Sequence, residues 1–212
     1  KPTIALLDGL SLGGGSELAL ACQAIVATPA GSMAFPETGI GIYPGLGGML
    51  RMARHVGPEL AKYYTFTGAG ISAADAYAMG IVTRLVEPAD VPKAIDELAA
   101  QGRLDKYAER TLPERFQKLA ALCSPQAVKD LLSGKVPASV DAEAASKLLK
   151  TMGYKAPIAL RIANEIIDRQ VSLSMEEAME VELGRLAEIF STADALEGLS
   201  SAGRKRPEFK GQ

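Results

Sequence analysis

The sequence predicts an α/β protein that continues into a helical C-terminal region. Short apolar strand patterns alternate with helix patterns up to about residue 88, which is typical of α/β folds. From about Ala89 onward the pattern is helical, polar and charged. Lys1, Asp8, Glu17 and Glu37 are the only charged residues among the first 50, so the first quarter of the chain has the composition of a core.

The first elements are expected where apolar runs meet glycine or proline. Residues 4–7, in "TIALL", predict a buried strand that ends at Asp8-Gly9. "SELALACQ", residues 16–23, predicts a short helix entered through a glycine turn, and "AIVAT", residues 24–28, a second strand. The segment "MAFPETGIGIYPGLGG", residues 33–48, is rich in glycine and proline and predicts a loop.

Three helices and a strand are expected after this loop. Residues 48–57 predict a helix that stops at a glycine, and residues 58–68 predict one that begins at a proline. "SAADAYAMG", residues 72–80, begins with a serine N-cap and ends at a glycine, and "IVTRLV", residues 81–86, predicts a strand.

The remaining residues predict only helices. Residues 89–101 are amphipathic, and residues 104–155 hold several helix-length patterns that prolines and a glycine interrupt. After "PIALRIANEIIDRQ", residues 157–170, Ser174 and Glu177 form a capping box. The helix that starts there is expected to align Met175, Met179, Leu183, Leu186 and Phe190 on one face.

Composition excludes several classes of function. The net charge is −2 and no long basic run is present, so nucleic acid is not an expected partner. Cys22 and Cys123 lack metal-ligand spacing, which predicts free thiols, no zinc site and a cytoplasmic location. No segment approaches the roughly 20 apolar residues of a membrane span, so we expect no membrane partner. Because the sequence starts at Lys1 rather than methionine, we expect a piece of a longer polypeptide.

A glycine-rich turn precedes one isolated carboxylate. Gly13, Gly14 and Gly15 stand before Ser16 and Glu17, in a stretch with almost no other charge. Glycines let backbone amides approach an acceptor, as helix N-termini do, although a first-turn glutamate stabilised by the helix dipole is the alternative. Neither a phosphate loop nor a dinucleotide motif matches. An amide aimed at a carbonyl oxygen that becomes an enolate suits the turn better.

A second carboxylate, Glu37, also has mostly apolar and glycine neighbours, in "FPETGIGIYPG". Alone, it could be a loop carboxylate bonded to local amides. Two such carboxylates can have separated pKa values and act as acid and base, which the addition of water to a double bond requires. Asp8 is interpreted as a turn residue and His55, the single histidine, as a helix-end cation, so no serine–histidine triad is expected.

Three segments resemble the crotonase superfamily, the enoyl-CoA hydratase/isomerase group. They are "KPTIALLDGLSLGGGSELALACQAIVAT", "FPETGIGIYPGLGGMLRMARHVG" and "FTGAGISAADAYAMGIVTRLVEP", which together cover residues 1–88 almost continuously. The ending "EGLSSAGRKRPEFKG" is similar too. The resemblance implies a partial ββα superhelix core, residues 1–98, then a helical insertion, residues 99–155, and a C-terminal trimerisation or lid region, residues 156–212.

The resemblance also assigns roles to individual residues. It makes Gly14 one amide donor of an oxyanion hole, Glu17 the activator of water and Glu37 the proton donor to the α-carbon. Support of the acyl pocket and its loops is expected from Gly13, Gly15, Pro36 and Gly45. Related isomerases commonly keep one of the two glutamates, so both together favour hydration of a 2-enoyl-CoA in fatty-acid degradation, with no metal and no cofactor besides the CoA of the substrate.

Two departures from the family pattern keep alternatives open. The family's first oxyanion amide comes from a region before "KP", so we expect the 212 residues to be catalytically incomplete alone. The insertion resembles the 3-hydroxyisobutyryl-CoA hydrolase branch, which tends to lose the Glu17 position and to carry aspartate at Gly45. A thioesterase, an enoyl-CoA isomerase and a non-catalytic assembly module therefore remain alternatives. The expected assembly is a homotrimer or dimer of trimers, with fusion to a 3-hydroxyacyl-CoA dehydrogenase module as a further hypothesis.

Overall fold

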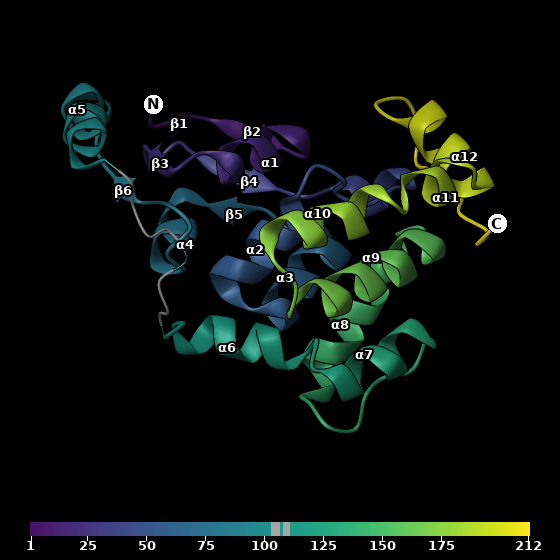
Figure 1. The fold of residues 1–212 in the computed structure, drawn as a ribbon. Coiled ribbons are helices and arrows are strands. Elements are labelled where there is room, and N and C mark those ends of the chain that lie inside the picture. Colours follow the sequence, from purple (N-terminus) through teal and green to yellow (C-terminus); the bar gives the residue numbers. More distant parts are fainter. Residues whose placement is uncertain (103–106, 108–110) are drawn as a thin grey trace.

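The computed structural model describes residues 1–102, 107 and 111–212, and it is a mixed α/β protein with a helical C-terminal part, as predicted (Figure 1). Residues 103–106 and 108–110 of the predicted insertion lie outside the described residues. Within the described ranges, no helix is both long and apolar enough to cross a membrane.

Two small sheets form the N-terminal half. In the first sheet, β1 (Ile4–Leu7) pairs in parallel with β3 (Ala24–Ala27), which pairs in parallel with β6 (Arg84–Leu85). In the second, β4 (Ser32–Ala34) lies between β2 (Leu10–Leu12), parallel to it, and the antiparallel β5 (Ile71–Ser72). The first four strands therefore alternate between the two sheets. Every residue of β3 is buried, as in parallel strands covered on both faces.

Helices cover these sheets and, with the loops that connect them, make up the rest of the described chain. They are α1 (Gly14–Ala21), η1 (Glu37–Ile40), α2 (Gly48–Val56), α3 (Pro58–Thr67), α4 (Ala73–Ala78), η2 (Pro88–Asp90), α5 (Val91–Gln101), α6 (Glu114–Ala121), α7 (Pro125–Leu132), α8 (Ala142–Met152), α9 (Pro157–Gln170), α10 (Met175–Leu183), α11 (Leu186–Phe190) and α12 (Ala193–Ser201).

Helices α2 and α3 lie at the centre of the molecule, with the sheets and α1 on one side and α6 and α7 on the other (Figure 1). One core packs the strands against α2, α3 and α4, and Phe116 of α6 reaches into it. A second core packs α3 against α7, α8 and α9. Burial of apolar side chains on both faces of α2 and α3 therefore joins the two halves of the chain.

Most predicted helices and strands are confirmed, and the residues expected to start and stop the helices do so. Helix α2 ends before Gly57, α3 begins at Pro58, and the Ser72 hydroxyl accepts a hydrogen bond from the Asp75 amide at the start of α4. Ser174 and Glu177 form the predicted capping box.

Two predictions of element length are wrong. The strand expected at residues 81–86 shrinks to Arg84–Leu85, because the amides of Ile81 and Val82 both donate to the Ala76 carbonyl and close the end of α4. The helix expected from Ser174 does not continue to Phe190 but breaks into α10 and α11. At the break the Tyr43 hydroxyl donates to the Glu182 carbonyl at 2.6 Å and so competes for an acceptor that a continuous helix would use internally.

We predict that Gly198→Ala destabilises the fold where α12 crosses η1. A Cβ at position 198 would overlap the backbone of Ile40 and Gly41, which cannot move aside as a flexible side chain can. The free energy of unfolding should fall by about 1–3 kcal/mol in urea denaturation. The matched control is Ser200→Ala, at an exposed position of the same helix, and an equal loss in both variants would contradict the prediction.

Candidate active site

The glycine-rich turn places Glu17 in the first turn of α1, in the interior of the protein. Gly13 is the N-cap and adopts φ +54°, a backbone region that side chains disfavour. Ser16 fixes the start of α1 against β4, because its hydroxyl donates to the Ser11 carbonyl at 2.8 Å and accepts from the Ala34 amide at 3.2 Å. Glu17 is consequently only 3% exposed.

Two backbone amides from the start of α2 solvate the Glu17 carboxylate. Its Oε1 accepts from the amide of Leu46 at 2.8 Å and from that of Gly48 at 2.9 Å. The approach requires glycine at position 48, because a Cβ there would lie 2.8 Å from Glu17 Oε1. Burial raises the pKa of Glu17, while the two amides and the charge of Arg51 act in the opposite direction.

Glu37 lies in a different environment, at the first position of η1. It is 7% exposed, and its Oε1 lies so close to Gly13 that a Cβ there would be 2.6 Å away. Its Oε2 is buried and has no hydrogen-bond partner among the described residues. Burial is the main cause that raises the pKa of Glu37 to about 7; its own backbone amide acts against this rise, and the neighbouring Glu17 charge contributes to it.

Both glutamates line one cavity of about 530 Å³, a volume in the range of small-molecule sites. Its other walls are mostly apolar side chains and glycines. The full lining is Leu12, Gly13, Gly14, Glu17, Pro36, Glu37, Ile40, Ile42, Tyr43, Gly45, Leu46, Leu186 and Phe190. Gly14 is the first residue of α1, so its amide lacks an intrahelical acceptor and is available to a ligand in the cavity.

Six of the seven residues predicted for the site line this cavity: Gly13, Gly14, Glu17, Pro36, Glu37 and Gly45. Gly15 is not among the lining residues, and a Cβ there would meet the Ser11 hydroxyl at 3.0 Å, so its place is beside the site. Asp8 accepts from the Thr28 hydroxyl at 2.5 Å, a structural contact at the turn. His55 is near the end of α2, with its ring 4.8 Å from that of Tyr107.

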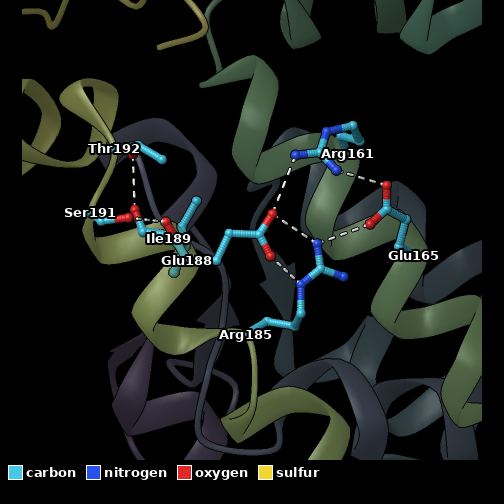
Figure 2. A network of polar contacts seen from close by, with 7 residues as sticks. All are labelled: Arg161, Glu165, Arg185, Glu188, Ile189, Ser191 and Thr192. Carbon is cyan, nitrogen blue, oxygen red and sulfur yellow. Dashed lines mark hydrogen bonds and ion pairs between the residues drawn. The ribbon is translucent and has the colours of Figure 1, made fainter.

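Helix α11 contributes two apolar lining residues, Leu186 and Phe190, that sequence reasoning had placed only on a helix face. A network of ion pairs binds α11 to α9 and is drawn in Figure 2. Arg185 contacts Glu188 and, at 3.0 Å, Glu165, while Arg161 contacts the same Glu165 at 2.9 Å. Exposed pairs of this kind contribute little stability individually, so we interpret the network as fixing the geometry of this cavity wall.

The site shows no other recognisable chemistry in the part of the chain that the structure describes. No group of three or more His, Cys, Asp or Glu residues there could hold a metal ion. The arrangement therefore offers two carboxyl groups with different environments, a backbone amide and an apolar wall.

The fold matches solved enoyl-CoA hydratases. A crystal structure of an enoyl-CoA hydratase from Rhodobacter sphaeroides 2.4.1 aligns with a TM-score of 0.78 at 26% identity, over 100% of this chain and 64% of that one. A carnitinyl-CoA dehydratase from Mycobacterium thermoresistibile aligns with a TM-score of 0.76 at 25% identity, over 99% of this chain and 63% of that one. The chain thus has the crotonase fold, as the sequence resemblance predicted.

A family model described as enoyl-CoA hydratase/isomerase matches residues 1–209, so the chain belongs to this family of the crotonase superfamily. Bovine (Bos taurus) enoyl-CoA hydratase domain-containing protein 2, mitochondrial, is 32% identical over 212 residues, 100% of this chain and 56% of that protein. Crotonyl-CoA hydratase of Syntrophomonas wolfei subsp. wolfei is 38% identical over 121 residues, 57% of this chain and 45% of that protein. The chain spans about half the length of these curated relatives.

We predict that Glu17→Gln lowers the pKa of Glu37. The negative charge of Glu17 helps to raise that pKa, so its removal should move the Glu37 titration from about pH 7 toward more acidic values. Carbon-13 NMR of side-chain-labelled glutamate checks this, with Glu37 assigned by the signal lost in Glu37→Gln. The control is Glu114→Gln, an exposed position on α6. An unchanged or raised Glu37 pKa in Glu17→Gln would contradict electrostatic coupling between the two groups.

Proposed function

We propose that the protein adds water to a 2-enoyl-CoA and yields a 3-hydroxyacyl-CoA. The observation that supports this most is the pair of buried glutamates, Glu17 and Glu37, on one largely apolar cavity. Hydration needs one group that takes a proton from water and one that delivers a proton to carbon. Relatives named crotonyl-CoA hydratase and short-chain-enoyl-CoA hydratase support the same reaction.

In the proposed reaction Glu17 is the base. Its two amide partners act against the rise in pKa that burial causes. The ionised form of Glu17 is therefore better solvated than the ionised form of Glu37. The water oxygen bonds to the β-carbon while one water proton passes to Glu17. The electrons of the double bond move toward the thioester oxygen, to which the Gly14 amide donates as one member of the oxyanion hole.

Glu37 is the acid in this proposal. A carboxyl group with a pKa of about 7 holds its proton in a large fraction of molecules at neutral pH. Glu37 gives this proton to the α-carbon, which collapses the enolate and completes the addition. The difference in solvation between the two carboxyl groups thus assigns the roles of base and acid.

We predict that Glu17→Gln and Glu37→Gln each lower kcat for hydration by about 10²–10⁴-fold, because each removes a proton-transfer group. The measurement follows crotonyl-CoA absorbance and 3-hydroxyacyl-CoA formation in the full-length protein. The control, Glu143→Gln, changes an exposed glutamate of α8 and should retain normal activity.

Other products would contradict hydration in different ways. Release of free CoA would indicate a thioesterase. Turnover of a 3-enoyl-CoA that survives Glu17→Gln would indicate an isomerase. Absence of activity on every acyl-CoA, together with stable oligomers, would indicate a non-catalytic assembly module.

A further inference from the structure

A third buried glutamate, Glu182, lies behind the cavity on α10. It is 0% exposed, and it does not belong to the residues that line the cavity. Its carboxylate accepts from the Gly47 amide through Oε1 and from Gln170 Nε2 at 3.1 Å through Oε2. A buried carboxylate is costly unless such partners satisfy it, so its position calls for a reason.

The Gly47 amide that Glu182 binds belongs to the turn at residues 45–48, which also contacts Glu17. Successive amides of this turn point to two different carboxylates, with Leu46 and Gly48 on Glu17 and Gly47 between them on Glu182. Arg51 Nη1 also donates to the Leu46 carbonyl at 3.0 Å. Gly47 has φ +85°, a conformation that external contacts must hold because glycine itself is conformationally permissive.

Glu182 is itself held from two directions. The Tyr43 hydroxyl donates to its backbone carbonyl at 2.6 Å, and Gln170 Nε2 donates to the Ala178 carbonyl at 2.9 Å as well as to the Glu182 side chain. The carboxylate is therefore a fixed acceptor on a fixed helix. Because the Glu182 carboxylate holds the Gly47 amide on one side of the turn at residues 45–48, it determines where the amides of Leu46 and Gly48 point on the other side.

We propose that Glu182 is a positioning residue, which anchors the Gly47 amide and thereby keeps the amides of Leu46 and Gly48 on Glu17 Oε1. Its effect on catalysis rests on the function proposed above, because it acts through the base of that reaction. Its effect on the turn does not depend on the reaction.

Electrostatics are consistent with this arrangement. Burial is the main cause that raises the pKa of Glu182 to about 7, and the Glu17 charge raises it as well, whereas Gln170, the Gly47 amide and Arg51 oppose the shift. A protonated Glu182 still offers a carbonyl oxygen to the Gly47 amide. The anchor therefore needs an acceptor at this position rather than a charge.

Two variants with side chains of similar size separate the effect of the charge of Glu182 from the effect of its acceptor oxygen. Glu182→Gln keeps an acceptor oxygen without charge, whereas Glu182→Met fills a similar space and offers only the weak acceptor of a thioether sulfur. The matched control is Glu180→Met, an exposed position two residues away on α10. Gln170→Met is a second route, since it leaves Glu182 in place but removes the donor that orients it.

The first readout is amide hydrogen exchange at Leu46, Gly47 and Gly48, measured without substrate in the full-length protein. We expect exchange at these amides to be at least about tenfold faster in Glu182→Met, near that of wild type in Glu182→Gln, and unchanged in Glu180→Met. Gln170→Met should give an intermediate increase in the exchange rate of these amides. If Glu182→Met does not fold, the result for Gln170→Met tests whether Glu182 anchors the turn.

The second readout is hydration kinetics. We expect kcat of Glu182→Met to fall about tenfold or more with KM changed less than about threefold, because the base and not the bound substrate is affected, and Glu182→Gln should restore most of kcat. In the background of Glu17→Gln, Glu182→Met should cost little further, since both changes act on the same group.

The two readouts distinguish the possible failures. Faster exchange in a protein whose wild type hydrates no enoyl-CoA would refute the proposed function and leave the anchoring of the turn supported. Unchanged exchange at Leu46 and Gly48 in both Glu182→Met and Gln170→Met would overturn the inference, whatever the kinetics. An equal loss of kcat in Glu182→Gln and Glu182→Met would overturn it too, because an acceptor would then not suffice.

Discussion

The two amide hydrogen bonds from Leu46 and Gly48 to Glu17 are the interaction on which the rest of the site depends. A carboxyl group with 3% exposure can be ionised only where protein groups solvate it, since water cannot reach it freely. The donors lie about thirty residues further along the chain, at the start of α2. The contact therefore connects α1 to α2 and makes the position of the turn a condition for the chemistry.

At Glu37, among the described residues, a single backbone amide, its own, opposes the effect of burial on the pKa. Its Oε2 lacks a partner among the described residues, and its pKa rises to about 7. Two chemically identical groups on one cavity thus differ in their hydrogen bonding, and the proposed roles of proton acceptor and proton donor rest on this difference. Gly13 makes this pairing possible, because any side chain there would displace Glu37.

The part of the cavity wall that α11 forms is built differently. Leu186 and Phe190 come from a five-residue helix, which ion pairs connect to α9 and which follows the break after α10, where Tyr43 donates to the Glu182 carbonyl. The turn, α10 and α11 thus meet around Tyr43 and Glu182. The domain boundaries, the trimer, the dehydrogenase fusion and the cytoplasmic location stay predictions.

The amino-acid sequence by itself determined the family, the α/β class, most helix ends and the two glutamates of the candidate site. The family follows from the resemblance of three segments, and the other features follow from local signals: glycine and proline punctuation, capping residues and unusual acids in a nearly charge-free stretch. Short strands such as Ser32–Ala34, the split of the helix predicted from Ser174 and the burial and partners of Glu182 were decided by the tertiary structure. Glu182 is one of several glutamates in "MEEAMEVE", and only the arrangement of α10 against Gly47 and Gln170 separates it from its exposed neighbours. Hydrogen-bond partners distant in sequence leave no periodic trace, because they depend on packing between elements and not on spacing within one.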